Sequence, residues 1–231
     1  FLAKRTDFLV AVGNQVKEDL LAAGIGKADQ YRVFFPGLVE PKKISKDVAR
    51  QQFEMGAGDV YVAYVGRMTG IKRPDRLLNT AAEIKARNLP VKFIVAGEGD
   101  LFGTTKNDAE RRDLPVTFLG WRNDIGALFA ASDIAILTSD NEGIPLTLIQ
   151  AAQAGLPIVA TNVGSISDIV LNESTGYLTS TTAAEMADAI EKLVRDPQLR
   201  QMMGAAGKAH AERYFSLDRM IKDHSDLYRS L

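Results

Sequence analysis

Cysteine is absent from the 231-residue sequence, which excludes disulfides and thiolate metal sites and fits an intracellular location. The sequence also lacks any apolar run near the ~18 to 20 residues that a membrane-spanning helix needs. Its formal net charge is only −1, so it lacks the surplus of basic residues that is typical of nucleic-acid-binding proteins. We therefore expect a cytoplasmic protein with no nucleic-acid partner, and association with the inner face of a membrane stays open.

The composition that remains is ordinary for a globular protein, with 46% hydrophobic and 25% charged residues. A chain of this length suits one large domain, or one domain with part of another. The first residue is Phe1 and not methionine. We expect the sequence to be a piece excised from a longer protein.

Apolar runs alternate with helix-forming segments along most of the chain. Continuous apolar strands between helices are typical of a parallel sheet that helices cover on both faces, so we predict an α/β, Rossmann-like fold. The stretch 38–46 has little apolar pattern and is the best candidate for a linker. The predicted strands are 8–12, 31–35, 60–65, 91–96, 116–119, 134–137, 158–161 and 176–178. The predicted helices are 15–23 (with Asn14 as its cap), 74–87, a helical or irregular piece ending near 112, 124–131, one opening at 142–145 and closing at Gly155, 166–170, 183–194, 198–213 and 217–230.

The stretch 133–161 places a carboxylate at a junction between a strand and a helix. The apolar run 134–137 is followed by a polar turn, and Glu142, Gly143 and Pro145 indicate the start of the next helix. In an open α/β sheet, ligands bind at the edge where strand carboxyl ends and helix amino ends meet. Glu142 is therefore a candidate site residue.

The loop 66–74 follows another predicted strand and contains two glycines, and Arg67 and Lys72 bring two cations toward the amino end of the helix that Pro74 begins. Arg67 and Lys72 at a helix amino end suit a diphosphate. The loop is not a Walker motif, because its spacing is Gly-x3-Gly-x-Lys and no Ser or Thr follows Lys72 to bind magnesium. A solvated basic turn is the alternative.

Three further motifs are weaker. The run 97–103 resembles a dinucleotide fingerprint, but its third glycine is misplaced by one residue, so a plain turn is favoured. The segment 120–123 could hold a nucleobase, although Trp121 alone would more often pack at the sheet edge. Asp140 and Glu142 flank an amide and would suit magnesium, but Arg67 and Lys72 already offer phosphate neutralisation, so we predict no metal site.

Taken together, these loops resemble the donor-binding half of retaining glycosyltransferases of the GT-B fold, the large group called family 4. Several spaced motifs in one order are far more specific than any single loop. The resemblance covers roughly residues 30–230. It implies that residues 39–231 are the C-terminal, nucleotide-sugar-binding domain, and that residues 1–38 are the end of an acceptor-side half. The matching segments are 65–67 with Lys72, 95–99, 118–120, 139–143, 154–160, and 164–166 with 175–176.

The resemblance also implies roles for particular residues. Arg67 and Lys72 would bind the donor diphosphate, and Glu142 would face the transferred sugar; these three are the predicted catalytic residues. The family's second glutamate, eight positions later, would bond the ribose, but here that position is Gln150. Eight helical steps span about 12 Å, which suits the distance from sugar to ribose. The full donor-binding set is Gly66, Arg67, Lys72, Gly120, Trp121, Arg122, Glu142, Gly143, Ile144, Pro145, Leu146 and Gln150.

The expected donor is a nucleoside-diphosphate sugar, most simply a UDP-sugar, with no cofactor, and the acceptor is open. The acceptor-side half, with the histidine and glycine-rich loop that the family places against the sugar, has no counterpart in this sequence. We therefore expect the isolated chain to bind donor without transferring sugar. The two strands before residue 38 should pack on the donor domain, pair with another copy, or stay mobile.

Three other functions are compatible with parts of the sequence. A sugar-nucleotide epimerase or phosphorylase would share the GT-B architecture, but the pattern of Glu142 with Arg67 and Lys72 argues against it. A non-catalytic nucleotide-binding module is favoured if Gln150 marks lost donor binding. A dinucleotide-dependent oxidoreductase is disfavoured by the misspaced run 97–103.

Overall fold

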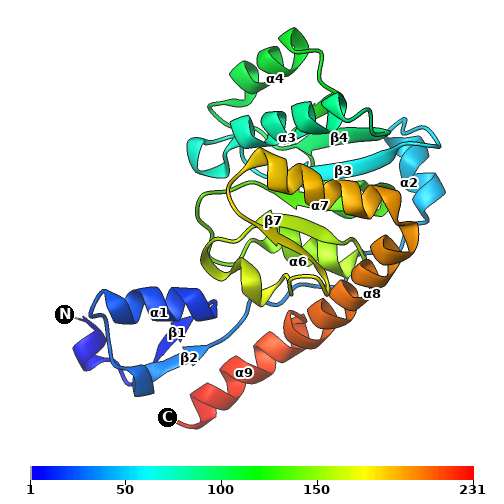
Figure 1. The fold of residues 1–231 in the computed structure, drawn as a ribbon. Helices are drawn as coiled ribbons and strands as arrows, with labels where there is room; N and C mark the ends of the chain where they lie inside the picture. Colours follow the sequence, from blue (N-terminus) through cyan, green and yellow to red (C-terminus); the bar gives the residue numbers. More distant parts are fainter. Residues whose placement is uncertain (1) are drawn as a thin grey trace.

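The computed structural model describes residues 2–231, and Phe1 lies outside the described residues. Helices and strands alternate along most of the chain, as Figure 1 shows. No helix of residues 2–231 is both long and apolar enough to cross a membrane. The strands are β1 (Leu9–Ala11), β2 (Tyr31–Val33), β3 (Val60–Val65), β4 (Val91–Ala96), β5 (Val116–Gly120), β6 (Ile134–Leu137), β7 (Ile158–Thr161) and β8 (Gly176–Thr179). The α-helices are α1 (Asn14–Ala22), α2 (Lys46–Gln52), α3 (Pro74–Ala86), α4 (Phe102–Arg111), α5 (Ile125–Ala131), α6 (Leu146–Gln153), α7 (Ala183–Arg195), α8 (Pro197–Tyr214) and α9 (Leu217–Arg229). The 3₁₀ turns are η1 (Leu2–Arg5), η2 (Ala28–Gln30), η3 (Gly70–Lys72) and η4 (Gly164–Asp168).

Six of the strands form one parallel sheet in the order β5-β4-β3-β6-β7-β8. The predicted α/β fold with a parallel sheet between helices is therefore confirmed. The chain builds the half β3-β4-β5 outward in one direction and then returns to place β6 on the other edge of β3. The crossover makes the β3–β6 boundary the topological switch point, where the loops after neighbouring strands diverge and leave room for a ligand.

The two faces of the sheet are both apolar because alternate side chains of each strand point to opposite sides. On β3, Val62 and Tyr64 face one layer of helices while Tyr61 and Ala63 face the other, and all four are buried. A run of β-branched and aromatic residues suits such a strand, since its side chains pack well on a pleated surface. This double burial explains why the strand signals in the sequence are continuous and not alternating.

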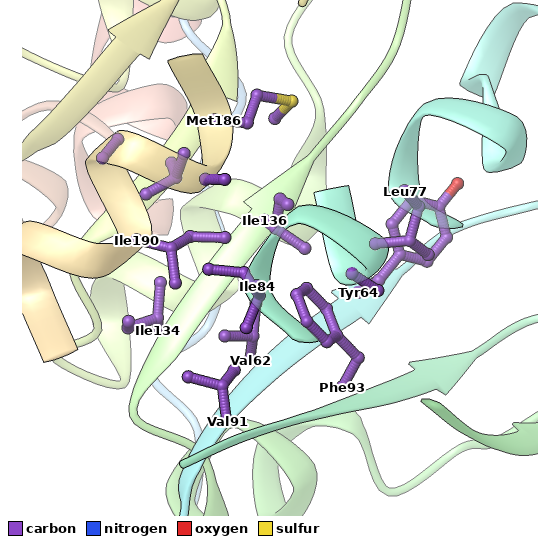
Figure 2. Packing of buried hydrophobic residues seen from close by; sticks show 14 of the residues in the cluster. Val62, Tyr64, Leu77, Ile84, Val91, Phe93, Ile134, Ile136, Met186 and Ile190 are labelled. Carbon is purple, nitrogen blue, oxygen red and sulfur yellow. The ribbon is translucent and has the colours of Figure 1, made fainter. Parts of the chain in front are cut away.

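Helices α3 and α7 cover the first face. Their residues Leu77, Ile84, Met186 and Ile190 meet strand residues such as Phe93 in one buried cluster, drawn in Figure 2. Full burial of an apolar side chain of this size stabilises the fold by roughly 1.5–3 kcal/mol. Pro74 begins α3 at a position where a missing N–H costs nothing.

Helices α2, α5, α6 and α8 cover the second face, in two adjoining clusters. The first cluster joins α6 and α8 to β6 and β7 through residues such as Ile149 and Phe215. The second joins α2 and α5 to β3 and β4 through residues such as Ala49 and Leu128.

Asp133, immediately before β6, ties α2 to the amino end of the sheet. Its Oδ1 accepts from Lys46 Nζ at 2.5 Å, and its Oδ2 accepts from Arg50 Nη2 at 2.8 Å and from the Tyr61 amide at 2.8 Å. The residue is only 8% exposed. A carboxylate that deep needs such partners, because an unpaired buried charge is strongly destabilising.

The strands β1 and β2 pair in parallel with each other and not with the large sheet. Together with α1 they form a small separate unit, the blue part of Figure 1, which α9 approaches from the other end of the chain. The unit contacts the larger one: the amide and side-chain amide of Asn14 donate to Asp168 at 2.8 and 2.6 Å, and Phe35 packs on Phe215 at a ring distance of 5.1 Å. The two strands thus pair with each other, and the contacts to the larger unit come from the flanking residues Asn14 and Phe35.

Three local predictions were wrong. Asn14 is the first residue of α1 and not its cap, because Asp168 from a distant turn takes the capping role. The predicted linker ends in an unpredicted helix, α2, whose start Ser45 caps by accepting from Val48 N. Helix α6 begins at Leu146, so Glu142, Gly143 and Ile144 lie in the loop before it.

Candidate functional site

The candidate site lies at the edge of the large sheet where its parallel strands have their carboxyl ends. Three loops meet this edge: 66–73 after β3, 120–124 after β5, and 138–145 after β6. β3 and β6 are neighbours in the sheet, so the first and third loops flank the switch point directly. The predicted diphosphate loop and the predicted sugar carboxylate are thereby brought together.

Lys72 and Glu142 form an ion pair between Lys72 Nζ and Glu142 Oε1. The side chains are 17% and 10% exposed, so the pair is well shielded but still reachable from solvent. Ser139 Oγ donates to the same Oε1 at 2.6 Å. In the described part of the chain, Glu142 Oε2 has no hydrogen-bond donor. One oxygen of the carboxylate is thus fixed and the other is available.

Buried hydroxyls hold the backbone on both sides of this pair. Thr138 Oγ1 donates to the Lys72 carbonyl at 2.8 Å, and Thr161 Oγ1 donates to the Ser139 carbonyl at 2.7 Å. Gly164 lies against the Glu142 carbonyl so closely that an added Cβ would be 1.7 Å from that oxygen, and its φ is +53°. Only glycine tolerates this approach and this conformation together.

Arg76 of α3 holds the loop 138–142 in place through its guanidinium. Its Nη1 donates to the carbonyls of Thr138 and Ser139, and its Nη2 donates to Asp140 Oδ1 at 2.7 Å. Arg76 is 4% exposed, so its charge is compensated almost entirely by these three acceptors. The residue was not predicted, since a lone arginine inside a helix is typical of a solvent-exposed position.

Asp140 is the acidic partner of this anchor. Hydrogen bonds from Arg76, and then from Arg73, hold the pKa of the Asp140 carboxyl below its ordinary value of 3.8. Residues 2–231 contain no group of three or more His, Cys, Asp or Glu side chains placed to hold a metal ion. The two cations around Asp140 would repel a divalent ion from the same carboxylate.

Arg67 is exposed at the end of β3, and within the described residues its guanidinium has no hydrogen-bond or ion-pair partner. Its carbonyl accepts from Tyr64 Oη at 3.3 Å. Burial, and to a smaller extent the negative charge of Glu142, raises the pKa of Tyr64 above its ordinary value. Tyr64 is therefore a neutral donor that supports the Arg67 backbone and leaves the arginine side chain free.

Residues 97–101 form a turn that packs on the loop after β3, and residues 102–103 begin α4. A Cβ on Gly97 would lie 2.0 Å from the Gly66 carbonyl oxygen, and one on Gly99 would lie 2.4 Å from that of Met68. The Met68 amide also donates to the Glu98 carbonyl at 3.0 Å. Close backbone packing accounts for both glycines, in agreement with the turn interpretation.

In the loop after β5, Trp121 is 68% exposed, so it does not pack into the sheet edge. Its amide donates to Glu98 Oε1 at 3.3 Å. Arg122 is less available than predicted, because Asp124 accepts from its Nε and Nη2 at 2.8 and 2.5 Å and Phe53 lies under its guanidinium. The exposed indole is the part of this loop that is open to a flat ligand.

Gln150 does not lie eight helical steps beyond Glu142. Because α6 begins at Leu146, only part of the separation from Glu142 is helical, and the rise of eight helical steps does not apply. The Gln150 side chain is half-buried and has no hydrogen-bond partner in residues 2–231. Gly143 and Ile144 are not at the helix amino end, but in the described chain their backbone N–H groups have no acceptor either. Pro145 is buried at the helix start and Leu146 is 48% exposed.

The site and fold define a class of protein: a Rossmann-like domain of the GT-B type, with a carboxylate and two cations at its switch point. Residues 45–210 match the model of the family described as glycosyl transferases group 1. The match covers more than half of the chain, so the protein belongs to the glycosyl transferases group 1 family.

Similar curated proteins include two D-inositol 3-phosphate glycosyltransferases. The one from Rhodococcus erythropolis is 32% identical over 181 residues, which is 73% of this chain and 41% of that protein. The one from Corynebacterium aurimucosum is 30% identical over 229 residues, 92% of this chain and 54% of that protein. The chain thus spans about half the length of these relatives.

Among solved structures, the fold is similar to Anabaena HepE in complex with UDP. The TM-score is 0.89 at 24% sequence identity, over 97% of this chain and 64% of that one. The complex of the same protein with UDP-glucose gives a TM-score of 0.87 over the same share of this chain. At this identity the likeness establishes a common fold.

Proposed function

We propose that the chain is the nucleotide-sugar-binding part of a retaining glycosyltransferase, and that Arg67, Lys72 and Glu142 do its chemistry. The observation that carries the proposal is the Lys72–Glu142 pair at the switch point of the sheet, with one carboxylate oxygen unused. By contrast, Asp133 at the other end of β6 has both carboxylate oxygens bonded to protein donors.

The cations account for diphosphate binding and for part of the rate. As the bond between sugar and phosphate breaks, negative charge grows on the leaving diphosphate. Lys72 has two further N–H groups beyond the one that bonds Glu142, and Arg67 has its whole guanidinium free for phosphate oxygens. Fixed cations stabilise the developing charge without reorganising, which is the condition for efficient electrostatic catalysis.

The carboxylate accounts for the sugar side. Glu142 Oε2 accepts a hydrogen bond from a sugar hydroxyl, and its negative charge offsets the positive character that forms at the anomeric carbon. Glu142 lies beside Lys72, so the sugar and the diphosphate are held on the same side of the cleft. For transfer with retention, the acceptor oxygen would attack the anomeric carbon from the face that the diphosphate leaves, on the side where Lys72 lies.

We propose that the donor is a uridine nucleotide, with uracil as its base. Support comes from Anabaena HepE, a protein of the same fold that was solved with UDP and with UDP-glucose. The exposed Trp121 indole offers a stacking surface for the base, and the unpaired amide of Gln150 offers hydrogen bonds to the ribose. Amide contacts are weaker than those of a carboxylate, so the ribose contributes less to affinity than the diphosphate.

The chain should bind donor and not turn it over. It spans about half the length of the relatives it matches, and the acceptor-side half belongs to the rest of such a protein. We propose that residues 2–38 are the end of that half, joined to the donor domain. A complete enzyme would close the cleft over Glu142 and exclude water there.

Isothermal calorimetry with UDP-, GDP- and ADP-sugars tests the proposal. We expect the UDP-sugar to bind in preference to the others, and Arg67→Ala to weaken it about tenfold, since a charge-assisted contact contributes about 1.5–3 kcal/mol. The matched control is Arg111→Ala, which removes an exposed arginine of α4 far from the loops. Absence of binding by the wild type, or steady transfer of sugar by this chain alone, would overturn it.

A further inference from the structure

Glu142 is held by two donors that differ in how firmly they are themselves held. Lys72 reaches Oε1 at the end of a flexible four-carbon chain. Ser139 reaches the same oxygen with a hydroxyl one bond away from Cβ, at 2.6 Å. Ser139 is fully buried, two residues after the last residue of β6.

The backbone of Ser139 is fixed by the sheet and by α3. Its carbonyl accepts from Thr161 Oγ1 at 2.7 Å and from Arg76 Nη1 at 3.3 Å. Thr161 and Arg76 are themselves buried. With its backbone held, the Ser139 hydroxyl can move only by rotation about one side-chain bond, whereas the Glu142 carboxylate turns about three, so the carboxylate adjusts more readily to the hydroxyl than the reverse.

We propose that Ser139 is a positioning residue that sets the rotation of the Glu142 carboxylate, so that Oε1 faces Lys72 and Oε2 faces the donor sugar. The proposal rests on the proposed function of this site. When a diphosphate binds, the attraction of Lys72 is shared between the phosphate oxygens and Glu142. Ser139 is then the one donor, among the described residues, whose hold on Oε1 does not change.

The role of Ser139 can be separated from general folding by comparing two ligands. UDP would contact the cations but lacks the transferred sugar that Glu142 would bind, whereas UDP-glucose would engage both the cations and Glu142. We expect Ser139→Ala to leave the Kd for UDP within about twofold of the wild type and to raise the Kd for UDP-glucose about tenfold, the range of one hydrogen bond to a charged group.

The strand β6 provides a matched control at its other end. Ser132 is also buried, precedes β6, and donates to the Leu128 carbonyl at 2.7 Å. Ser132→Ala should leave the ratio of the two dissociation constants unchanged. Ser139→Thr keeps the hydroxyl and should restore most of the wild-type ratio. If the alanine variant does not fold, Ser139→Cys replaces it, because a thiol fills the space but is a weak donor.

A double-mutant cycle shows whether Ser139 acts through Glu142. In the Glu142→Ala background, Ser139→Ala should have no further effect on UDP-glucose binding, giving a coupling equal to its effect in the wild type. An unchanged ratio in Ser139→Ala, or equal losses for UDP and UDP-glucose, would overturn the inference and leave the proposed function standing. A wild-type chain that binds neither ligand would overturn the proposed function itself.

Discussion

Each end of strand β6 has a carboxylate with a basic neighbour, but the two carboxylates differ in how many of their oxygens accept hydrogen bonds from the protein. At its amino end, Asp133 receives three donors, two of them from cations, and both of its oxygens are occupied. At its carboxyl end, Glu142 receives a cation and a hydroxyl on Oε1 alone. The guanidinium of Arg67, which is close in sequence to Lys72, has no hydrogen-bond or ion-pair partner among residues 2–231.

A carboxylate with basic neighbours is therefore not enough to identify a ligand site. Asp133 joins α2 to the sheet and has no capacity left for another molecule. Glu142 has an unused oxygen on the edge of the sheet where ligands bind. Unused hydrogen-bonding capacity, more than charge, distinguishes the two ends, and variants at each end test that distinction.

The largest effect should follow Asp133→Ala. Removal of the carboxylate leaves the Tyr61 amide without its acceptor and the half-buried Arg50 without its counter-ion, so we expect a loss of about 3–5 kcal/mol in the free energy of unfolding. Urea denaturation measures it. UDP-glucose affinity of the folded variant should stay at the wild-type level. A loss below about 1 kcal/mol would show that Asp133 is not the structural anchor described.

Arg76→Met tests whether filled hydrogen-bonding capacity marks a structural residue. Arg76 lies beside the site, but its side chain, like that of Asp133, is fully occupied by protein partners. We expect a loss of about 2 kcal/mol in unfolding free energy, since two backbone carbonyls lose a donor while Asp140 remains solvated. Lys106→Met on the exposed face of α4 is a control that removes a charge without such contacts. Equal stability of the Arg76 and Lys106 variants would contradict the anchoring role.

Glu142→Gln should show the opposite profile to Asp133→Ala. The amide keeps an oxygen for Ser139 and Lys72, so stability should change by less than about 1 kcal/mol. UDP-glucose should bind about tenfold more weakly, because a neutral acceptor replaces the charged one that faces the sugar. Calorimetry with UDP as the reference ligand gives the contrast. If UDP and UDP-glucose weaken together, Glu142 does not face the sugar.

The smallest effect concerns Asp140 and acid. Arg76 and Arg73 lower its pKa in the folded state below 3.8, so its contribution to stability is complete above that value and is lost as the pH falls through the lowered pKa. The side chain is 44% exposed, which limits the contribution to about 1 kcal/mol or less. Asp140→Asn should therefore lose less stability than the wild type as the pH is lowered below about 4. Parallel urea titrations across that range measure the difference, and identical slopes would contradict it.

The sequence predicted the buried strands well because their signal is local. The ranges 60–65, 91–96, 134–137 and 158–161 agree with β3, β4, β6 and β7. Helix α2 was missed because it has only one buried residue, Ala49, and is held by the distant Asp133. Its stability comes from tertiary contacts that no local pattern contains.

The sequence predicted where the site lies but not which of its residues pair with one another. Arg67, Lys72 and Glu142 could be placed at one sheet edge from the order of strands and loops. The sequence could not show whether Asp140 or Glu142 is the partner of Lys72, because both residues follow the same strand. The pairing depends on Arg76, which forms a hydrogen-bonded ion pair with Asp140. It also depends on Gly164, which lets a distant turn approach the Glu142 backbone. Neither dependence is visible in the spacing of residues.

The crossover between β3 and β6 also governs when the site can exist during folding. Lys72 belongs to the part of the chain that forms β3, β4 and β5, and Glu142 belongs to the part that forms β6, β7 and β8. An intermediate with only the first three strands paired has the cations but no carboxylate between them. A nucleotide sugar bound as we propose would stabilise the completed sheet selectively, and it should slow unfolding while leaving the first steps of folding unchanged.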